Sequence, residues 1–247
     1  MLINYPIILI LALISGMTTL VGAGLATYCK GNIKAIVMGI GFSTGIMLMI
    51  SFFELIPEAL EKSALLNVVM AVLAGIIILA FLNFIIPHSH LMKEKEKNKS
   101  YLYKVAFLVT LGLILHDFPE GFAMANSYAL APNLGIFVAV AIALHNIPEE
   151  FAIAAPIVML KDKKFLYKAA FISSLAEPAG AIFGLIGITI IPSLTPIFLA
   201  FAAGAMIFVS IHELVPFAQK YKLPLYFISG IILSILVFLL LKFFFTL

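Results

Sequence analysis

Charge is the scarcest property of this sequence. Its 247 residues include no arginine and no tryptophan, and charged residues make up only 11%, against about 25% in soluble domains. The hydrophobic fraction is 64% and the mean hydropathy is +1.19. A chain with so few charges cannot cover itself with a hydrated surface, so we expect lipid to surround most of its length.

Cysteine is nearly absent as well. The single Cys29 excludes an internal disulfide and gives no information about the redox compartment. The net charge of +3 comes from lysines that lie between apolar runs rather than on one face, so no nucleic-acid partner is predicted. The first apolar run, 5–28, lacks a basic leader and is long enough to span a bilayer. We therefore expect a membrane helix there and not a cleaved signal peptide.

Apolar runs of about 20 residues, enough to cross the hydrocarbon core as helix, recur along the whole chain. They predict an all-α membrane protein with a single transmembrane domain, 1–247, of eight helices. One segment, 88–102, is polar enough to be a solvated cytoplasmic loop. The expected spans lie near 5–28, 34–57, 66–87, 103–126, 133–156, 166–190, 196–217 and 223–246.

The lysines indicate the orientation of these spans. Thirteen of the fifteen flank the first, third, fifth and seventh connections, and only Lys62 and Lys242 lie on the opposite side. Because lysine-rich loops remain in the cytoplasm, both termini are predicted to be outside. We expect a multi-pass protein of the cell (inner) membrane with both termini extracytoplasmic.

Acidic residues, by contrast, occur inside the predicted spans. An unpaired charge at the bilayer centre costs at least ~2.5 kcal/mol on insertion scales, so these carboxylates need a shared reason to be there. A cation, a proton or a water-filled cavity would each supply one. Seven of the twelve acidic residues are placed in this way: Glu54, Asp117, Glu120, Glu149, Glu150, Glu177 and Glu213.

Two adjacent spans contain matched motifs, HDFPEG in 103–126 and HNIPEE in 133–156. Residues four apart on a helix lie on one face, and the residue after the histidine falls on the same arc. Each helix thus presents one nitrogen and two oxygen ligands to one side. The six residues are His116, Asp117, Glu120, His145, Asn146 and Glu149.

A lone histidine in a membrane is usually a packing residue and a lone proline a simple kink, but a duplicated motif with buried acids favours a metal site. Pro119 and Pro148 leave two backbone carbonyls without their usual intrahelical hydrogen bond and kink both helices. Irregular backbone within the membrane is tolerated where it lines a cavity. Glu177, in the AEPAG of the sixth span, falls at the same depth. Four formal negative charges suit two divalent ions, or one ion plus protons. Mixed nitrogen and oxygen ligands suit Zn²⁺, Fe²⁺, Mn²⁺ or Co²⁺ and not Cu⁺.

The second and seventh spans repeat one another. GFSTGIMLMISFFELIPEA and AFAAGAMIFVSIHELVPFA share eight identities at an offset of 159. As the second and seventh spans they run in opposite directions, which predicts a 3+2+3 bundle with inverted repeats, a plan common among transporters. Glu54 and Glu58 then lie toward the outer face, and His212 and Glu213 toward the inner face. These residues are candidates for a cation pathway. The alternative is that Glu58 and Glu213 are merely interfacial charges, which explains Glu58 as well as a pathway does but explains Glu213 less well.

The motifs HDFPEG, HNIPEE, AEPAG and the paired ELIP/ELVP resemble those of the ZIP (Zrt/Irt-like) divalent-metal transporters, and most closely the bacterial ZupT-like branch. The resemblance implies uptake of Zn²⁺, Fe²⁺, Mn²⁺, Co²⁺ or Cd²⁺ toward the cytoplasm by alternating access, with the metal as substrate and no organic cofactor. It implies that the six motif residues and Glu177 are ligands of a mid-membrane site that holds one or two ions. A methionine of the second span, Met47 or Met49, joins the ligands in some members. A homodimer in the lipid membrane is the family expectation.

Two residues depart from the family pattern. Asp117 stands where asparagine is usual, which adds a charge and favours harder ions such as Mn²⁺ or Fe²⁺. Glu150 stands where glycine is usual, and either faces away or adds an oxygen ligand. His88 and His90 lie in a loop that is often histidine-rich, but two histidines are as easily chance. Two other functions compete with the carrier: a metal-selective channel, and an intramembrane metal-dependent hydrolase, which the absence of HExxH disfavours.

Overall fold

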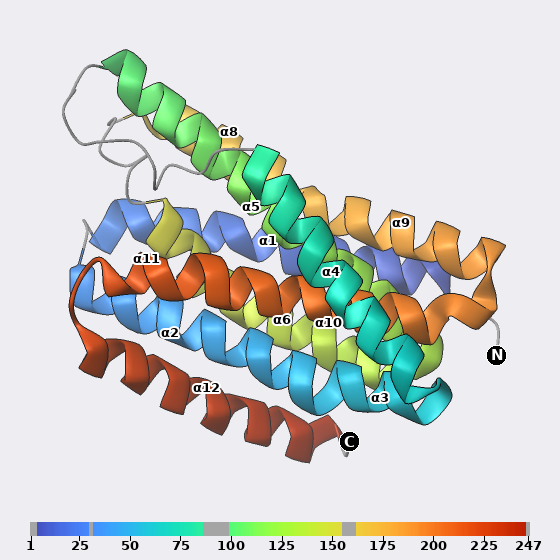
Figure 1. Cartoon of the computed structure of the whole chain (residues 1–247). Coiled ribbons are helices and arrows are strands. Elements are labelled where there is room, and N and C mark those ends of the chain that lie inside the picture. The colour runs from blue at the N-terminus through green and yellow to red at the C-terminus, as the bar shows by residue number, and fades with distance from the viewer. Residues whose placement is uncertain (1–3, 30–31, 86–98, 155–161, 246–247) are drawn as a thin grey trace.

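The computed structural model describes residues 4–29, 32–85, 99–154 and 162–245, and within these ranges the chain is almost entirely helical and contains no strand. Figure 1 shows a bundle of long helices that run side by side, with α4 crossing the others obliquely. The α-helices are α1 (Tyr5–Cys29), α2 (Ile33–Ile50), α3 (Ile56–Lys62), α4 (Leu65–Ile85), α5 (Lys99–Leu130), α6 (Pro132–Ile153), α8 (Lys163–Ser174), α9 (Ala176–Ile190), α10 (Thr195–Val209), α11 (Val215–Gln219) and α12 (Pro224–Phe245). A short 3-10 turn, η3 (Pro192–Leu194), precedes α10.

Seven helical stretches in the described part of the chain are long and apolar enough to cross a membrane. The 32-residue helix α5, which contains the first motif, is also long enough to cross a membrane. The prediction of an all-α protein built from membrane-spanning helices is therefore confirmed. The seven stretches are Tyr5–Tyr28, Ile33–Lys62, Leu65–Ile85, Pro132–Phe151, Lys163–Ile190, Pro192–Gln219 and Pro224–Phe245.

The predicted loop 88–102 is wrong at its last four residues, because α5 already begins at Lys99. A helix satisfies its own backbone hydrogen bonds, so polar residues at its start can continue it beyond the apolar run. His88 and His90 lie outside the described residues.

The sixth span is two helices rather than one. α8 ends at Ser174 and α9 begins at Ala176, with Leu175 between them. Pro178 explains the break, because it has no N–H for the carbonyl of Ser174 and its ring excludes that carbonyl from the helix. The break places Glu177 in the first turn of α9.

Both copies of the internal repeat contain a π-helical segment at the same position. These are η1 (Ser51–Leu55) and η4 (Ser210–Leu214), in which the N–H of the following residue donates to the carbonyl five residues earlier. Each segment is followed two residues later by a proline, Pro57 or Pro216, which prevents the usual i to i+4 bond at that turn. Single π-turns of this kind are frequent at functional sites.

The packing of the helices follows the inverted repeat. The most extensive helix pairs are α2 with α12, α5 with α9, α1 with α6, and α4 with α10. In a 3+2+3 inverted repeat, spans one, two and three correspond to spans six, seven and eight, and span four corresponds to span five. Under this correspondence the α2–α12 pair becomes α4–α10, and the α1–α6 pair becomes α5–α9. The N-terminal end of α1 and the C-terminal end of α12 lie at the same end of the bundle, which we call the termini face (Figure 1). That this face is outside the cell stays a prediction.

Matching glycines allow two of these pairs to approach closely. A Cβ on Gly204 of α10 would lie 2.1 Å from the carbonyl oxygen of Val72 in α4, and a Cβ on its repeat partner Gly45 would collide with Ser234 of α12. Small residues at such crossings bring helix backbones together in a membrane, where apolar burial alone gives no driving force between helices. The repeated glycine therefore explains the close packing of both α2 with α12 and α4 with α10.

Candidate metal centre

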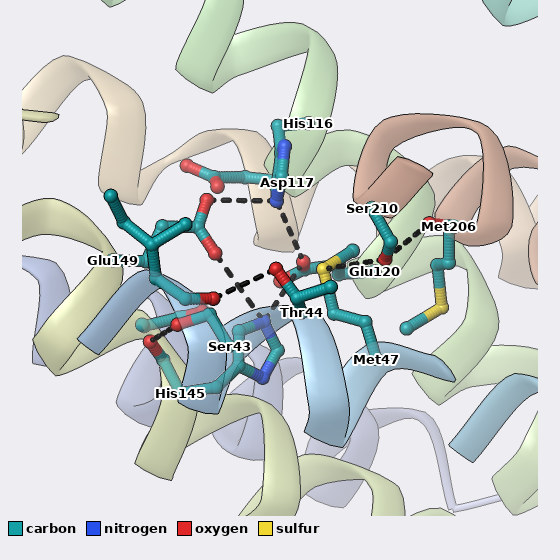
Figure 2. A network of polar contacts seen from close by, with 12 residues as sticks. Ser43, Thr44, Met47, His116, Asp117, Glu120, His145, Glu149, Met206 and Ser210 are labelled. Carbon is teal, nitrogen blue, oxygen red and sulfur yellow. Dashed lines mark hydrogen bonds and ion pairs between the residues drawn. The ribbon is translucent and has the colours of Figure 1, made fainter. Parts of the chain in front are cut away.

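The two motifs meet crosswise between α5 and α6. The Nε2 atom of His116 lies 2.8 Å from Oε1 of Glu149, and the Nε2 atom of His145 lies 3.1 Å from Oε1 of Glu120. Each histidine therefore contacts the glutamate of the other helix (Figure 2). All four side chains are at most 3% exposed, so the group lies in the interior of the bundle.

The spacing of three of these atoms would allow them to bind one ion. One ligand atom each from His116, Glu120 and Glu149 fall within 4.8 Å of one another. Within each helix, the histidine and glutamate of the same motif are farther apart, at 3.6 Å for His116 to Glu120 and 3.9 Å for His145 to Glu149. Ligand atoms around a tetrahedral zinc ion with 2.1 Å bonds are roughly 3.4 Å apart, so the set can close on a cation with small movements.

Several buried atoms of the group make no hydrogen bond of normal geometry in the described structure, although Nε2 of His116 and Oε1 of Glu149 are within ion-pair distance. They are Nε2 of His116, Oε2 of Glu120 and both carboxylate oxygens of Glu149. A buried polar atom without a partner costs about 1–3 kcal/mol, and a charged one more. A divalent cation would satisfy all of them at once, which is the reason that this donor set fits a metal.

The second histidine is oriented by its backbone. Nδ1 of His145 lies 3.1 Å from the carbonyl oxygen of Ala141, one turn earlier, and a proton on Nδ1 would make this a hydrogen bond. Nε2 then keeps its lone pair toward Glu120, which is the state that a metal ligand requires. The hydroxyl of Ser43 on α2 donates to the carbonyl oxygen of His145 at 2.9 Å. This hydrogen bond connects α6 to α2, the first copy of the internal repeat.

Three further predicted ligands form a second polar cluster beside the crosswise group. Asp117 accepts a hydrogen bond from the hydroxyl of Ser173 at 2.6 Å. The side-chain amide of Asn146 donates to Oε1 of Glu177 and, at 3.4 Å, to the carbonyl oxygen of Ser15. All three predicted ligands are buried, and Oε2 of Glu177 has no hydrogen-bond partner in the described structure. Sequence reasoning had missed both serines.

The comparison with known proteins agrees with this geometry. Residues 86–244, more than half of the chain, match the family model described as ZIP Zinc transporter. The chain belongs to the ZIP family. It is 37% identical to the zinc transporter ZupT of Corynebacterium aurimucosum over 85% of this chain and 86% of that protein. It is 36% identical to the zinc transporter ZupT of Chlorobium phaeovibrioides over 92% of this chain and 93% of the relative.

Membership of the ZIP family confirms the resemblance of the motifs and decides the broad function. The chain is an integral membrane transporter for divalent metal and not an enzyme, so the hydrolase alternative is excluded. A third relative, the zinc transporter ZupT of Stenotrophomonas maltophilia, is 31% identical over 88% of both chains.

Of the two candidate methionines in this ZIP chain, Met47 faces the interior. Met47 is fully buried, and its sulfur lies 3.5 Å from the hydroxyl of Ser210 in η4, whereas Met49 is partly exposed. Figure 2 shows the thioether directed at that hydroxyl in the same close view as Glu120. Ligation of the metal by Met47 stays a prediction. The contact of its sulfur with Ser210, in the other copy of the repeat, is an observation that the sequence did not predict.

The predicted pathway acids at the termini face are both paired with lysines. Glu54, in η1, is 7% exposed and lies 2.8 Å from Nζ of Lys242 in α12. Glu58 lies 3.2 Å from Nζ of Lys62 on the same helix. Their role in a pathway stays a prediction. The pair with Lys242 was not foreseen, because no sequence pattern links residues 188 positions apart.

The other predicted pathway residues lie in η4. His212 is exposed and stacks on Phe208 at a ring distance of 4.8 Å, and Glu213 is half-buried. Glu150 is buried, with its Cβ against Gly22 of α1 and Oε2 without a hydrogen bond in the described structure. Its Cβ therefore packs toward α1, and whether its carboxylate adds a ligand stays a prediction.

Proposed function

We propose that this ZIP transporter carries Zn²⁺ toward the cytoplasm and holds it in mid-membrane between the crosswise pairs His116–Glu149 and His145–Glu120. The single observation that supports this best is that one ligand atom each from the buried side chains of His116, Glu120 and Glu149 lie within 4.8 Å of one another. Two imidazoles with two carboxylates are ligands that zinc accepts. The curated relatives carry the name zinc transporter.

Transport by alternating access is supported by the burial of the site. Because the four ligands are at most 3% exposed, an ion bound there is closed off from both ends, and part of the protein must move to release it. The helix pairs suggest which part moves. The pairs α1–α6 and α5–α9 contain the motifs, and the pairs α2–α12 and α4–α10 contain the long repeats. We propose that the first four helices slide against the second four.

The second polar cluster is proposed to hold a second divalent ion or protons. Asp117 and Glu177 supply carboxylates there, and Asn146 supplies an amide oxygen if its side chain turns over. Oxygen-rich ligands favour harder ions, so this cluster is where Mn²⁺, Fe²⁺, Co²⁺ or Cd²⁺ would be distinguished from Zn²⁺. The chain is proposed to function in the cell (inner) membrane, as a homodimer surrounded by lipid, with both termini outside.

Uptake into proteoliposomes tests the proposed function. With zinc outside and an inside-negative potential, which adds about 2.3 kcal/mol per charge per 100 mV, we expect accumulation of radioactive zinc that saturates at low concentration. Mn²⁺, Fe²⁺, Co²⁺ and Cd²⁺ added outside should compete to different extents. Currents that grow in proportion to voltage at high rate would indicate a channel instead, and no accumulation above empty liposomes would contradict uptake.

A further inference from the structure

The ion pair between Glu54 and Lys242 closes the termini-face end of a line of buried side chains. Oε1 of Glu54 and Nζ of Lys242 are 2.8 Å apart, with the carboxylate 7% exposed and the ammonium side chain 36% exposed. Lys242 is in the last turn of α12, and Glu54 lies in the π-helical segment η1 of the second span. The pair thus joins two elements at the face where the chain begins and ends (Figure 1).

The line continues from Glu54 toward the metal centre along one side of the second span. Ser51 is fully buried, and its hydroxyl has no hydrogen-bond partner in the described structure. Met47, one turn further, is fully buried beside Ser210. Met47, Ser51 and Glu54 are all buried, while Phe52 and Phe53, in the same π-helical segment as Glu54, are about half exposed. The carboxylate, the hydroxyl and the thioether therefore follow one another along the buried side of the second span, and the thioether lies in the same close view as Glu120 (Figure 2).

We propose that Lys242 is a tethered counter-ion of Glu54 that an incoming divalent cation must displace before it can pass Ser51 and Met47 to the central site. This inference rests on the proposed uptake function and adds a residue that controls access to it. A dication attracts the carboxylate about twice as strongly as one ammonium charge at equal distance. Na⁺ and K⁺ lack this advantage, so the exchange favours divalent ions at the entrance.

The chain contains a matched control for this exchange. Lys62 and Glu58 form an ion pair at the same face, but the two residues are one turn apart on α3 and the lysine side chain is 41% exposed. Lys62→Met therefore removes the same charge from the same face without freeing Glu54. Surface pairs of this kind contribute at most about 1 kcal/mol, so this variant should fold.

The test is the zinc concentration dependence of uptake by full-length variants in proteoliposomes. Lys242→Met should lower KM for Zn²⁺ by about 10- to 100-fold, the size expected for one charge-assisted hydrogen bond, with kcat unchanged. Its uptake should also become sensitive to competition by 150 mM Na⁺, a concentration set near the usual physiological ionic strength of about 0.15 M. Glu54→Gln should raise KM, and Glu54→Gln/Lys242→Met should behave like Glu54→Gln, because removing the lysine helps only if the carboxylate is present.

Each outcome decides between the exchange and a purely structural ion pair. If Lys242→Met matches Lys62→Met in KM and in Na⁺ sensitivity, the exchange is overturned. If Lys242→Met lowers kcat and thermal stability and the double variant restores both, the pair is only structural. If wild type itself shows no uptake, the proposed function fails, and equilibrium zinc binding decides the inference. Lys242→Met should then bind one more ion than wild type, and an unchanged number would overturn it.

Discussion

Replacing Glu149 with alanine is expected to reduce zinc uptake by at least about 100-fold. Oε1 of Glu149 is 2.8 Å from Nε2 of His116, and Oε2 is 3.9 Å from Nε2 of His145, so this carboxylate contacts both imidazoles. Loss of a supporting residue outside the ligand set already costs 10- to 100-fold in metal affinity, and loss of a ligand should cost more. Initial rates of zinc uptake in proteoliposomes, corrected for the amount of inserted protein, measure the effect.

Glu61→Ala is the matched control, because Glu61 is an exposed glutamate of α3 and its removal changes the net charge equally. We expect this variant to take up zinc like wild type. A Glu149→Ala variant that transports zinc at the rate of Glu61→Ala would show that the crosswise group does not carry the metal.

Replacing Gly121 with alanine is expected to have the largest effect on folding. A Cβ at Gly121 would lie 1.9 Å from the carbonyl oxygen of Glu177, and a Cβ at Gly180 would lie 2.0 Å from the carbonyl oxygen of Phe118. The two glycines thus bring the backbones of α5 and α9 together from both sides. An added methyl must push the helices apart, and overpacking costs typically 1–3 kcal/mol and occasionally more.

Because Gly121 follows Glu120 and touches Glu177, the same change should also weaken metal binding. Thermal unfolding in detergent, with and without zinc, should show a lower Tm for Gly121→Ala and a smaller upward shift on adding zinc. Gly24→Ala on α1 is the control, since its Cβ would meet only the hydroxyl of Tyr167 at 3.6 Å, an ordinary contact. Equal Tm values for the two variants would contradict the close approach of α5 and α9.

Much of the fold follows from the sequence because the bilayer simplifies the problem. Apolar runs of about 20 residues predicted the spans, and the opposed repeats predicted helix pairs related by an inverted two-fold. The motif residues were predictable because four-residue spacing places His116 with Glu120, and His145 with Glu149, on one face. The crosswise pairing was not, because it depends on the angle and depth at which α5 meets α6.

Features that depend on backbone irregularity or distant contacts were not predictable in this way. The break at Leu175 and the π-helical turns η1 and η4 have a local cause in prolines, but a proline also permits a simple kink. The hydrogen bond of Ser173 to Asp117 and the ion pair of Lys242 with Glu54 join residues far apart in sequence. Asp117 was noted for its extra charge, yet only the tertiary structure shows a hydroxyl beside it.

The coordination of bound zinc tests the central claim most directly. X-ray absorption at the zinc edge, on purified protein with one equivalent of Zn²⁺, should show nitrogen and oxygen ligands at about 2.0–2.2 Å, two of them imidazoles. His116→Ala and His145→Ala should each lose one imidazole from the zinc shell. A shell without imidazole, or one that neither substitution changes, would contradict a metal site between the two motifs.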